Sequence, residues 1–208
     1  MKTRRLRITR NLPEWTAIDA AVRVIRQGGI IAFPTDTTYG LAAGIYCERA
    51  IRRLRRIKGR GPEEPFVLIA ADTDWVRELA ARVSQTHRRL MNAYWPGPLT
   101  LVFEASKAVP DYLVGRDGSV AIRIPDDALT QTILRASGVP LAAPSANLRA
   151  RKPAVSAAEV LASFKDTIDL VLDGGTVEGT MPSTIVAVGR GGLEILRKGR
   201  LEIAEDCA

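Results

Sequence analysis

Apolar residues along the chain follow two patterns: short continuous runs, and longer segments in which they recur every three or four positions. The runs are typical of buried strands, and the segments are typical of amphipathic helices. We expect helices over residues 14–27, 48–58, 75–94 (filled by more than one helix), 128–137 and 156–164. We expect strands over residues 30–33, 66–70, 99–103, 119–124, 141–143, 169–172, 184–188 and 193–197. Because strands alternate with helices, the pattern predicts an α/β fold.

Residues that end or begin helices support these boundaries. Glycines follow the first helical segment at 28–29 and the 128–137 segment at Gly138, where glycine often closes a helix. Ser156 and Glu159 have the spacing of a capping box, which favours a helix start there. The last three strands follow one another without helices between them, so we expect a mixed sheet rather than a purely parallel one.

Three further expectations concern the segment before the 14–27 helix, the helix itself and the segment after it. Leu6 and Ile8 alternate with arginines in the basic N-terminus, which favours a short edge strand. The apolar face of the 14–27 helix is expected to comprise Trp15, Ile18, Val22 and Ile25. Pro34 is expected to stop the strand before it, so that residues 35–40 form a polar loop.

The composition is that of a globular domain. Of the 208 residues, 46% are hydrophobic and 25% are charged, which argues against intrinsic disorder. No apolar run reaches transmembrane length, and the first ten residues lack the apolar centre of a secretory signal. Cys47 and Cys207 are far apart, so neither a disulfide framework nor a zinc site follows. We therefore expect a cytoplasmic protein with no membrane partner.

The charge balance points to anionic partners. Lys and Arg number 30 against 23 Asp and Glu, giving a net charge of +7. Nucleotides, polyphosphates or RNA fit such a balance, although a genome biased toward Arg codons would give the same count. His87, the single histidine, lies in a basic helical stretch. We expect it to be a solvated surface side chain rather than a member of a Ser-His-Asp triad.

Common nucleotide fingerprints are absent, namely the P-loop G-x-x-x-x-G-K-[ST] and a G-x-G-x-x-G after a strand. Instead, two segments, 33–41 and 143–147, share the order of strand, proline and small polar residues. Ligands collect beyond the carboxyl ends of strands in α/β sheets, but local turn chemistry would give the same residues. Lys58 and Arg60 flank a glycine at a helix end, where they can bind one anion or simply cap the helix.

Taken in order, these segments resemble the YrdC family of threonylcarbamoyl-AMP synthases. The likeness covers roughly residues 14–202 and includes the family's KxR and SxN pair. The matching stretches are GGIIAFPTDTTYGL (28–41), KGR (58–60), WPGPLT (95–100), VAIRIP (120–125), PSAN (144–147), STI (183–185) and LRKG (196–199).

The resemblance implies a YrdC-like fold: an α/β open twisted mixed sheet flanked by helices. It implies a single domain over residues 1–208, without the second, C-terminal domain of longer members. The implied reaction joins L-threonine, bicarbonate and ATP into threonylcarbamoyl-adenylate and releases pyrophosphate, usually with magnesium. The product would pass to a tRNA threonylcarbamoyl-transferase complex. The alternative is an RNA-binding module of the same fold without ATP chemistry, in which RNA contacts this chain directly.

By resemblance, the catalytic residues are Lys58 and Arg60, which also bind the ATP phosphates. Further nucleotide contacts fall on Ser119, Ser145, Asn147 and Arg197. Threonine contacts fall on Thr35, Arg123 and Ser183, with Arg123 pairing the carboxylate. The resemblance assigns no metal ligand.

The chain departs from the family pattern in two places. Gly61 separates Arg60 from the proline at Pro62, so the proline of the KxR motif is displaced. Ile69 stands where some members have a histidine in the following strand. The resemblance therefore implies no threonine contact at residue 69.

Overall fold

A computed structural model describes residues 2–61, 64–178, 181–189 and 192–203. Cys207 and Pro62 lie outside these ranges. The strands in the described part are β1 (Arg4–Arg7), β2 (Ile31–Pro34), β3 (Tyr39–Gly44), β4 (Val67–Ile69), β5 (Leu99–Glu104), β6 (Ser119–Arg123), β7 (Leu141–Ala142), β8 (Leu170–Asp173), β9 (Thr184–Gly189) and β10 (Gly192–Arg197). The helices are α1 (Trp15–Arg26), α2 (Glu48–Lys58), α3 (Thr73–Leu79), α4 (Gln85–Tyr94), α5 (Ala128–Ser137) and α6 (Ala157–Phe164).

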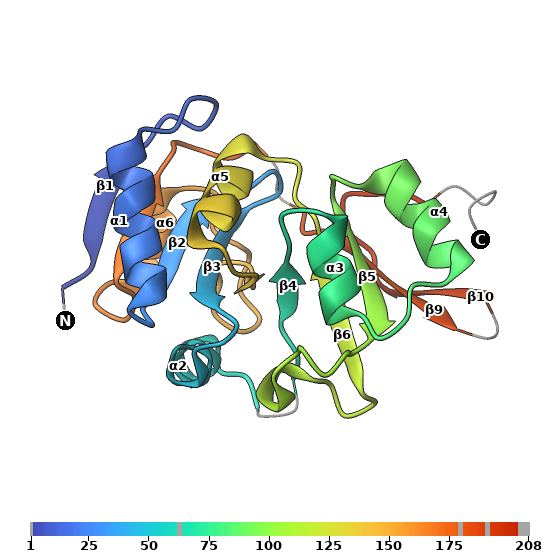
Figure 1. The fold of residues 1–208 in the computed structure, drawn as a ribbon. Helices are drawn as coiled ribbons and strands as arrows, with labels where there is room; N and C mark the ends of the chain where they lie inside the picture. The colour runs from blue at the N-terminus through green and yellow to red at the C-terminus, as the bar shows by residue number, and fades with distance from the viewer. Residues whose placement is uncertain (1, 62–63, 179–180, 190–191, 204–208) are drawn as a thin grey trace.

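The strands join into one sheet with the order β1-β8-β2-β3-β7-β4-β6-β5-β9-β10 (Figure 1). The sheet is open, because β1 and β10 lie at its two edges. It is mixed: β8 pairs in parallel with β1 and β2, whereas β3 pairs antiparallel with β2 and β7. The predicted fold class, an open mixed α/β sheet flanked by helices, is confirmed, and so is the N-terminal edge strand.

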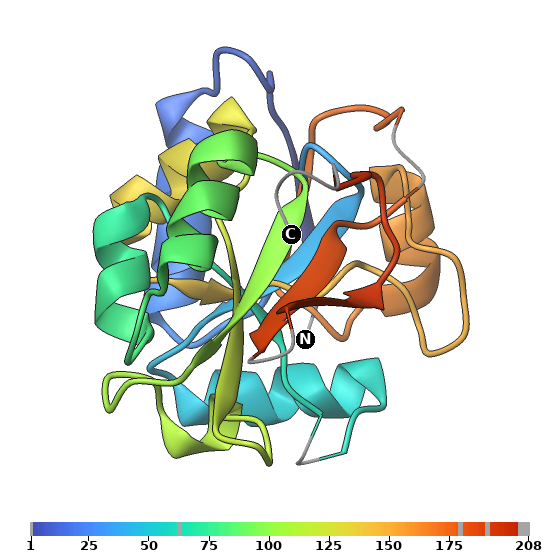
Figure 2. The ribbon, with the colours of Figure 1, turned by 90° about the vertical axis from the view of Figure 1, so that its right-hand side faces the viewer.

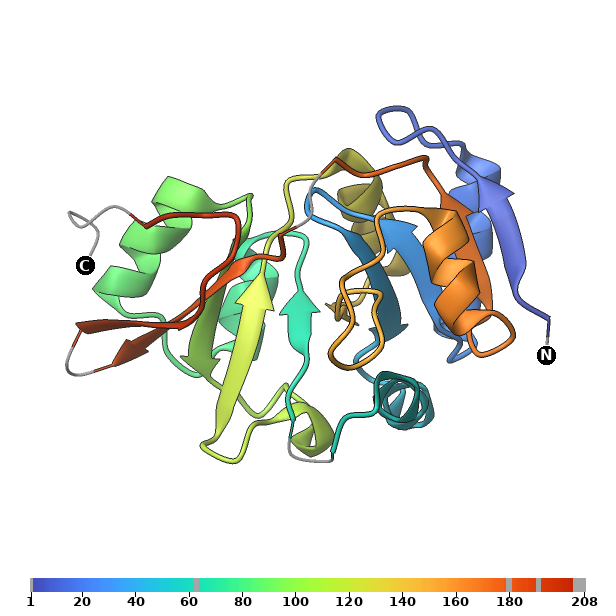
Figure 3. The ribbon, with the colours of Figure 1, turned by 180° about the vertical axis from the view of Figure 1, so that it is seen from behind.

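Helices cover both faces of the sheet. Figure 2 shows α1, α3, α4 and α5 on one side and α6 on the other. The apolar residues of α1 and α5 pack on Ile31, Phe33 and Leu170, whereas those of α2 and α6 belong to the core that contains Leu41 and Ala43. Figure 3, from behind, shows α6 and the β9–β10 hairpin on this second side. The central strands are therefore buried on both faces, as parallel and mixed α/β sheets require.

The structure corrects three of the predicted features. Residues 39–44 form β3, although its start was expected to lie in a polar loop. This strand is rich in glycine and alanine, residues with weak strand preference, and pairing on both edges specifies it instead. Pro34 is the last residue of β2 rather than a stop before it. Trp15 is 71% exposed, whereas Ala17 and Ile18 in the same first turn are buried, so Trp15 lies outside the buried face of α1.

None of the helices in the described ranges combines the length and apolar character that crossing a bilayer demands.

Two helices, α2 and α5, have the same first and last residues as the sequence predicted. α2 ends at Gly59 in the left-handed region (φ 60°), and α5 ends at Gly138 (φ 72°). Asp127 and Ser156 cap α5 and α6 by accepting backbone N–H groups through their side chains.

His87 was expected on the surface, and this expectation is wrong. The side chain is 7% exposed and its ring stacks on Phe103 with 4.4 Å between centroids. Nδ1 lies 2.8 Å from the Ser84 hydroxyl in a capping box, and Nε2 lies 3.0 Å from the Val102 carbonyl oxygen. Burial lowers the pKa of His87 below its ordinary value, although the bond to Val102 opposes this. Because most residues of α4 are polar or charged, the sequence pattern did not show that His87 faces inward.

Because the folded pKa of His87 lies below the unfolded one, the unfolded chain takes up the proton first as the solution is acidified. The neutral ring stabilises the fold fully above the ordinary pKa of about 6.5, and stability falls below that pH. We expect the free energy of unfolding in urea to drop between pH 7.5 and 5.5. His87→Gln keeps a capping side chain without a titrating group and should reduce this drop. An equal drop in both proteins would contradict the assignment.

Candidate functional site

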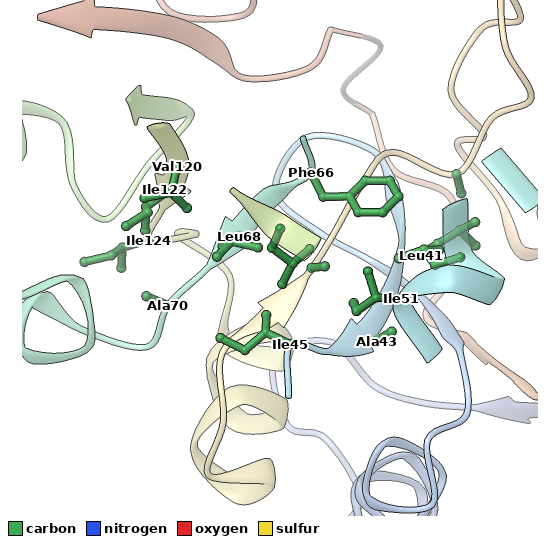
Figure 4. Close-up of a cluster of buried hydrophobic side chains, with 14 of the residues drawn as sticks. Leu41, Ala43, Ile45, Ile51, Phe66, Leu68, Ala70, Val120, Ile122 and Ile124 are labelled. Carbon is green, nitrogen blue, oxygen red and sulfur yellow. The ribbon is translucent and has the colours of Figure 1, made fainter. Parts of the chain in front are cut away.

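A cavity that is open to solvent lies on the sheet along β4. Its described lining comprises Thr35, Thr37, Thr38, Gly40, Arg60, Val67, Ile69, Arg123, Pro125, Ala143, Pro144, Ser145, Pro182, Ser183 and Arg197. Val67 and Ile69 form part of the floor, while the intervening Leu68 points into the opposite core (Figure 4). The alternation of the strand thus directs Leu68 away from the face on which Val67 and Ile69 border the cavity.

The two strand-proline-polar segments meet at this cavity. Gly40 forms an isolated bridge with Ser145, and the amide of Leu41 donates to the Pro144 carbonyl at 2.8 Å. The Ser145 segment adjoins the Val67 end of the cavity, since the Ala143 amide donates to the Val67 carbonyl oxygen. The other end is marked by Arg123, which pairs in register with Ile69. The cavity therefore has two ends, one on each side of β4.

Arg123 is 6% exposed, and its guanidinium is held from three directions. Nε donates to the Gly97 carbonyl at 2.8 Å, Nη1 to the Thr37 hydroxyl at 3.3 Å, and Nη2 to the Asp36 carboxylate. Residue 97 must be glycine for a separate reason, because a Cβ there would lie 2.4 Å from the Tyr94 carbonyl oxygen. Burial lowers the pKa of Arg123 while Asp36 raises it, and a guanidinium keeps its proton at neutral pH.

Asp36 is the carboxylate nearest the site. Burial raises the pKa of its carboxyl group, whereas the charge of Arg123 lowers it. Its Oδ2 is taken by Arg123, and its Oδ1 is buried with no hydrogen-bond partner in the described part of the chain. Asp36 does not belong to the cavity lining. Its charge therefore offsets one of the site cations without closing the cavity to anions.

Arg60 and Arg197 supply the other two guanidinium groups of the lining. Arg60 donates to the Pro65 carbonyl at 2.7 Å and lies 5.0 Å over the Phe66 ring. Arg197 donates to the Ser183 carbonyl from Nε and Nη2 at 3.1 and 2.8 Å. Burial lowers the pKa of both groups; for Arg197 the positive charges of Arg60 and Arg123 add to the effect. Arg197 thus lies within electrostatic range of both ends of the cavity.

Lys58 joins the KxR and SxN segments but does not line the cavity. Its ammonium group donates to the carbonyl oxygens of Ser145 (2.7 Å) and Asn147 and to Asn147 Oδ1 (2.9 Å). All three N–H groups of an ammonium are used in this way. Ser145 in turn donates its hydroxyl to Asn147 Oδ1 at 2.6 Å. Burial, and then the charge of Arg60, lowers the pKa of Lys58 to about 8.

Thr35 lines the cavity, but its hydroxyl hydrogen is used within its own loop. The hydroxyl donates to the Thr38 carbonyl at 2.8 Å and accepts from the amides of Thr37 and Thr38. Such side-chain to backbone bonds hold a turn in one conformation. Thr37, which the sequence did not single out, is the threonine of this loop that contacts Arg123.

The structure brings most of the predicted site residues together. The cavity lining includes Thr35, Arg60, Arg123, Ser145, Ser183 and Arg197, and Lys58 and Asn147 adjoin it. Ser119 is separate: it begins β6, at the other end of the strand from Arg123, and its hydroxyl donates to Asp117 at 2.6 Å. The lining residues that the sequence left unassigned include Thr37 and Thr38, both inside a segment it did identify.

The family model of the Sua5/YciO/YrdC proteins, described as telomere recombination, matches residues 23–199. The chain belongs to this family. A threonylcarbamoyl-AMP synthase of Pyrococcus abyssi is 33% identical over 200 residues, covering 96% of this chain and 58% of its own length. One of Klebsiella pneumoniae is 36% identical over 191 residues, covering 91% of this chain and 98% of its own length.

The fold of this Sua5/YciO/YrdC chain agrees with that of solved structures. The crystal structure of P. abyssi Sua5 complexed with L-threonine matches with a TM-score of 0.89 and 33% identity, covering 95% of this chain and 58% of that one. The chain thus spans little more than half the length of the P. abyssi protein, and nearly all of the Klebsiella one. The matched region contains all the residues that line the cavity.

The donor groups of this site do not form a metal cage of their own. The described lining offers hydroxyl and carbonyl oxygens but no carboxylate, and no group of three or more His, Cys, Asp or Glu gathers anywhere in the described ranges. Mg²⁺ commonly binds through substrate phosphates together with few protein ligands. The lining therefore fits a magnesium ion carried on a polyphosphate better than one held by the protein alone.

An anion site of this kind should bind inorganic pyrophosphate and stabilise the Sua5/YciO/YrdC fold by mass action. We expect pyrophosphate to raise the midpoint of thermal unfolding of the wild type. Arg197→Gln and Arg60→Gln should each weaken binding on the order of tenfold or more, because each removes a charge-assisted contact. Arg77→Gln is the control, since Arg77 pairs with Asp74 on the exposed surface of α3. Equal stabilisation of all four proteins would exclude the cavity as the anion site.

Proposed function

We propose that this chain makes threonylcarbamoyl-adenylate from L-threonine, bicarbonate and ATP and releases pyrophosphate. The observation that carries the proposal is the group of three guanidiniums, Arg60, Arg123 and Arg197, in a cavity whose described lining has no carboxylate. The curated relatives named threonylcarbamoyl-AMP synthase support the activity. The L-threonine held by P. abyssi Sua5 supports the amino-acid substrate.

The proposed reaction needs no protein nucleophile. The amine of threonine and bicarbonate give a carbamate and water. A carbamate oxygen then attacks the α-phosphorus of ATP, and pyrophosphate leaves. The difficulty is that carbamate and triphosphate are both anions, so the main tasks are to align them and to offset their repulsion. Fixed guanidinium groups do both, because they carry charge and directional donors.

The geometry supports a division of these tasks along the cavity. Arg123, with Thr37 and Thr35 beside it, would bind the carboxylate of threonine at the Ile69 end. Arg60 and the Ser145 segment would bind the nucleotide at the Val67 end, with Arg197 between them. Lys58 would act in two ways: it holds residues 145–147 in place by its hydrogen bonds, and its positive charge attracts the nucleotide. Ser119 stays a predicted nucleotide contact by resemblance; it does not line the cavity, but it lies toward the Val67 end, since Ala121 of the same strand pairs with Val67.

Magnesium enters the proposal as the ion on the ATP phosphates, and no protein ligand is assigned to it. Bicarbonate as co-substrate, a cytoplasmic location and transfer of the product to a tRNA threonylcarbamoyl-transferase complex are parts of the same proposal. The RNA-binding alternative is not favoured. The arginine-rich α2 would be its main support, but four of the five arginines in this helix are engaged within the protein: Arg49 with Gln27, Arg52 with Glu48, Arg53 with Asp169, and Arg55 with Gly61.

The direct test is a pyrophosphate-release assay with ATP, bicarbonate and single amino acids. We expect release that depends on L-threonine. Arg60→Ala or Lys58→Ala should lower the rate about 100-fold, because removing a preorganised charge costs roughly 3 kcal/mol of transition-state stabilisation. Lys107→Ala, which alters an exposed lysine, is the control. Release without preference among amino acids, or wild-type rates in either site variant, would refute the proposal.

The low pKa of Lys58 predicts how ATP binding depends on pH. The ammonium group loses its proton as the pH rises through about 8, so its charge is present below that pH and absent above it. We expect calorimetry without threonine to show a larger Kd for ATP at pH 9.5 than at pH 7.0. Lys58→Arg stays charged over this range and should show little change. An unchanged Kd in the wild type would contradict a role for the Lys58 charge.

A further inference from the structure

Thr100 is a buried polar residue that the proposed reaction leaves without a role. It is the second residue of β5, and its side chain is 0% exposed. Its hydroxyl lies 2.7 Å from the hydroxyl of Ser183, which lines the cavity. Ser183 Oγ also accepts from Arg197 Nη2 at 3.1 Å. Thr100 is therefore linked through one hydroxyl to the cavity and to one of its cations.

The direction of these hydrogen bonds follows from counting hydrogens. Within the described part of the chain, the Thr100 hydroxyl has no hydrogen-bond partner other than Ser183. A buried hydroxyl that failed to donate would lose a hydrogen bond to water without replacement, so Thr100 donates and Ser183 accepts. Ser183 accepts from Arg197 as well, since a guanidinium can only donate. Both lone pairs of Ser183 Oγ are then used, and its own hydrogen remains for the cavity.

The peptide group that joins Ser183 to Thr184 is fixed at both its carbonyl and its amide. Arg197 donates to its carbonyl oxygen, and the next residue, Thr184, donates its amide to the Pro98 carbonyl at 2.9 Å. The Thr184 hydroxyl accepts the amides of Gly199 and Leu201 and donates to the Leu201 carbonyl. The Ser183 hydroxyl is thus preorganised in place as well as in direction, which is the condition for an effective donor to a developing or fixed charge.

We propose that Thr100 is a positioning residue that makes Ser183 a hydrogen-bond donor to an anionic oxygen of a substrate. The oxygen is either the carboxylate of the amino acid or a phosphate of the nucleotide, and this assignment rests on the proposed function. A purely structural role would be served better by valine, which has the same shape and no hydroxyl to desolvate. The neighbours of Thr100 in β5, Leu99 and Leu101, are apolar core residues.

The test uses four variants: Thr100→Val, Thr100→Ser, Ser183→Ala and the double variant Thr100→Val with Ser183→Ala. The Kd of L-threonine and of ATP is measured by calorimetry, and pyrophosphate release is measured in parallel. We expect Thr100→Val to weaken one or both ligands about tenfold, and Thr100→Ser to restore the affinity because the hydroxyl returns. In the Ser183→Ala background, Thr100→Val should have no further effect, since its action passes through Ser183.

Ser137→Ala is the control, because it removes a buried hydroxyl from α5 that bonds only to backbone carbonyls away from the cavity. Weakening of threonine alone identifies a carboxylate partner, and weakening of ATP alone identifies a phosphate. Wild-type affinities in Thr100→Val, or an equal loss in the Ser183→Ala background, would overturn the inference. If the wild type binds its ligands but releases no pyrophosphate, the proposed function fails while the effect of Thr100→Val on binding still decides the inference.

Discussion

The site depends on cations that are withdrawn from water yet not neutralised by carboxylates. Arg60, Arg197 and Lys58 are held by backbone carbonyl oxygens, those of Pro65, Ser183, Ser145 and Asn147. A carbonyl satisfies an N–H group and fixes its direction, but it leaves the positive charge in place. Elsewhere the chain treats arginines differently, pairing Arg5 with Asp173 and Arg53 with Asp169. Among the described lining residues, Arg123 forms an ion pair with Asp36, and the charge of Glu64 acts on Arg60 from a distance.

This arrangement costs stability in the absence of a ligand. Burial lowers the pKa of Lys58, Arg60 and Arg197, which means that the charged forms are less favourable there than in water. An anion bound in the cavity would offset the desolvation of these cations. The free energy recovered in this way would contribute to the affinity for the anion. The fold offsets this cost through packing, since β2 and β3, which carry the Thr35 loop, are fully buried.

Much of the fold could be predicted because local signals and packing agree. Periodicity and glycine caps set the limits of α2 and α5, and alternation with arginine marked β1 as an edge. β3 was missed because its glycines and alanines have little preference of their own; its neighbours β2 and β7 specify it. His87 was misplaced for a related reason: one inward position in a polar helix leaves no mark on the charge pattern, and only the Phe103 ring identifies it.

For the site, the sequence supplied the residue types but not their directions. The KxR and SxN segments can be recognised in the sequence. Lys58, however, faces Asn147 rather than the cavity, because of the way α2 packs against the loop after β7. The hydrogen of Thr35 is likewise committed to Thr38, so Thr37 is the hydroxyl that reaches Arg123. Which group donates and which accepts depends on the whole hydrogen-bond network, so no single sequence motif predicts it.

The spacing of the cations along β4 explains why one cavity can hold two anions in the proposed reaction. Val67 and Ile69 are two residues apart on a strand, which separates the two ends by about 7 Å at the floor. Each anion would then meet its own guanidinium, Arg60 at one end and Arg123 at the other, while the apolar floor offers neither of them a competing partner. Arg197 lies within electrostatic range of both guanidiniums, so its charge would act on both anions. The strand β4 thus sets the distance between the two ends of the cavity, because Val67 and Ile69 are two residues apart. The side chain between them, Leu68, points the other way and packs into the core.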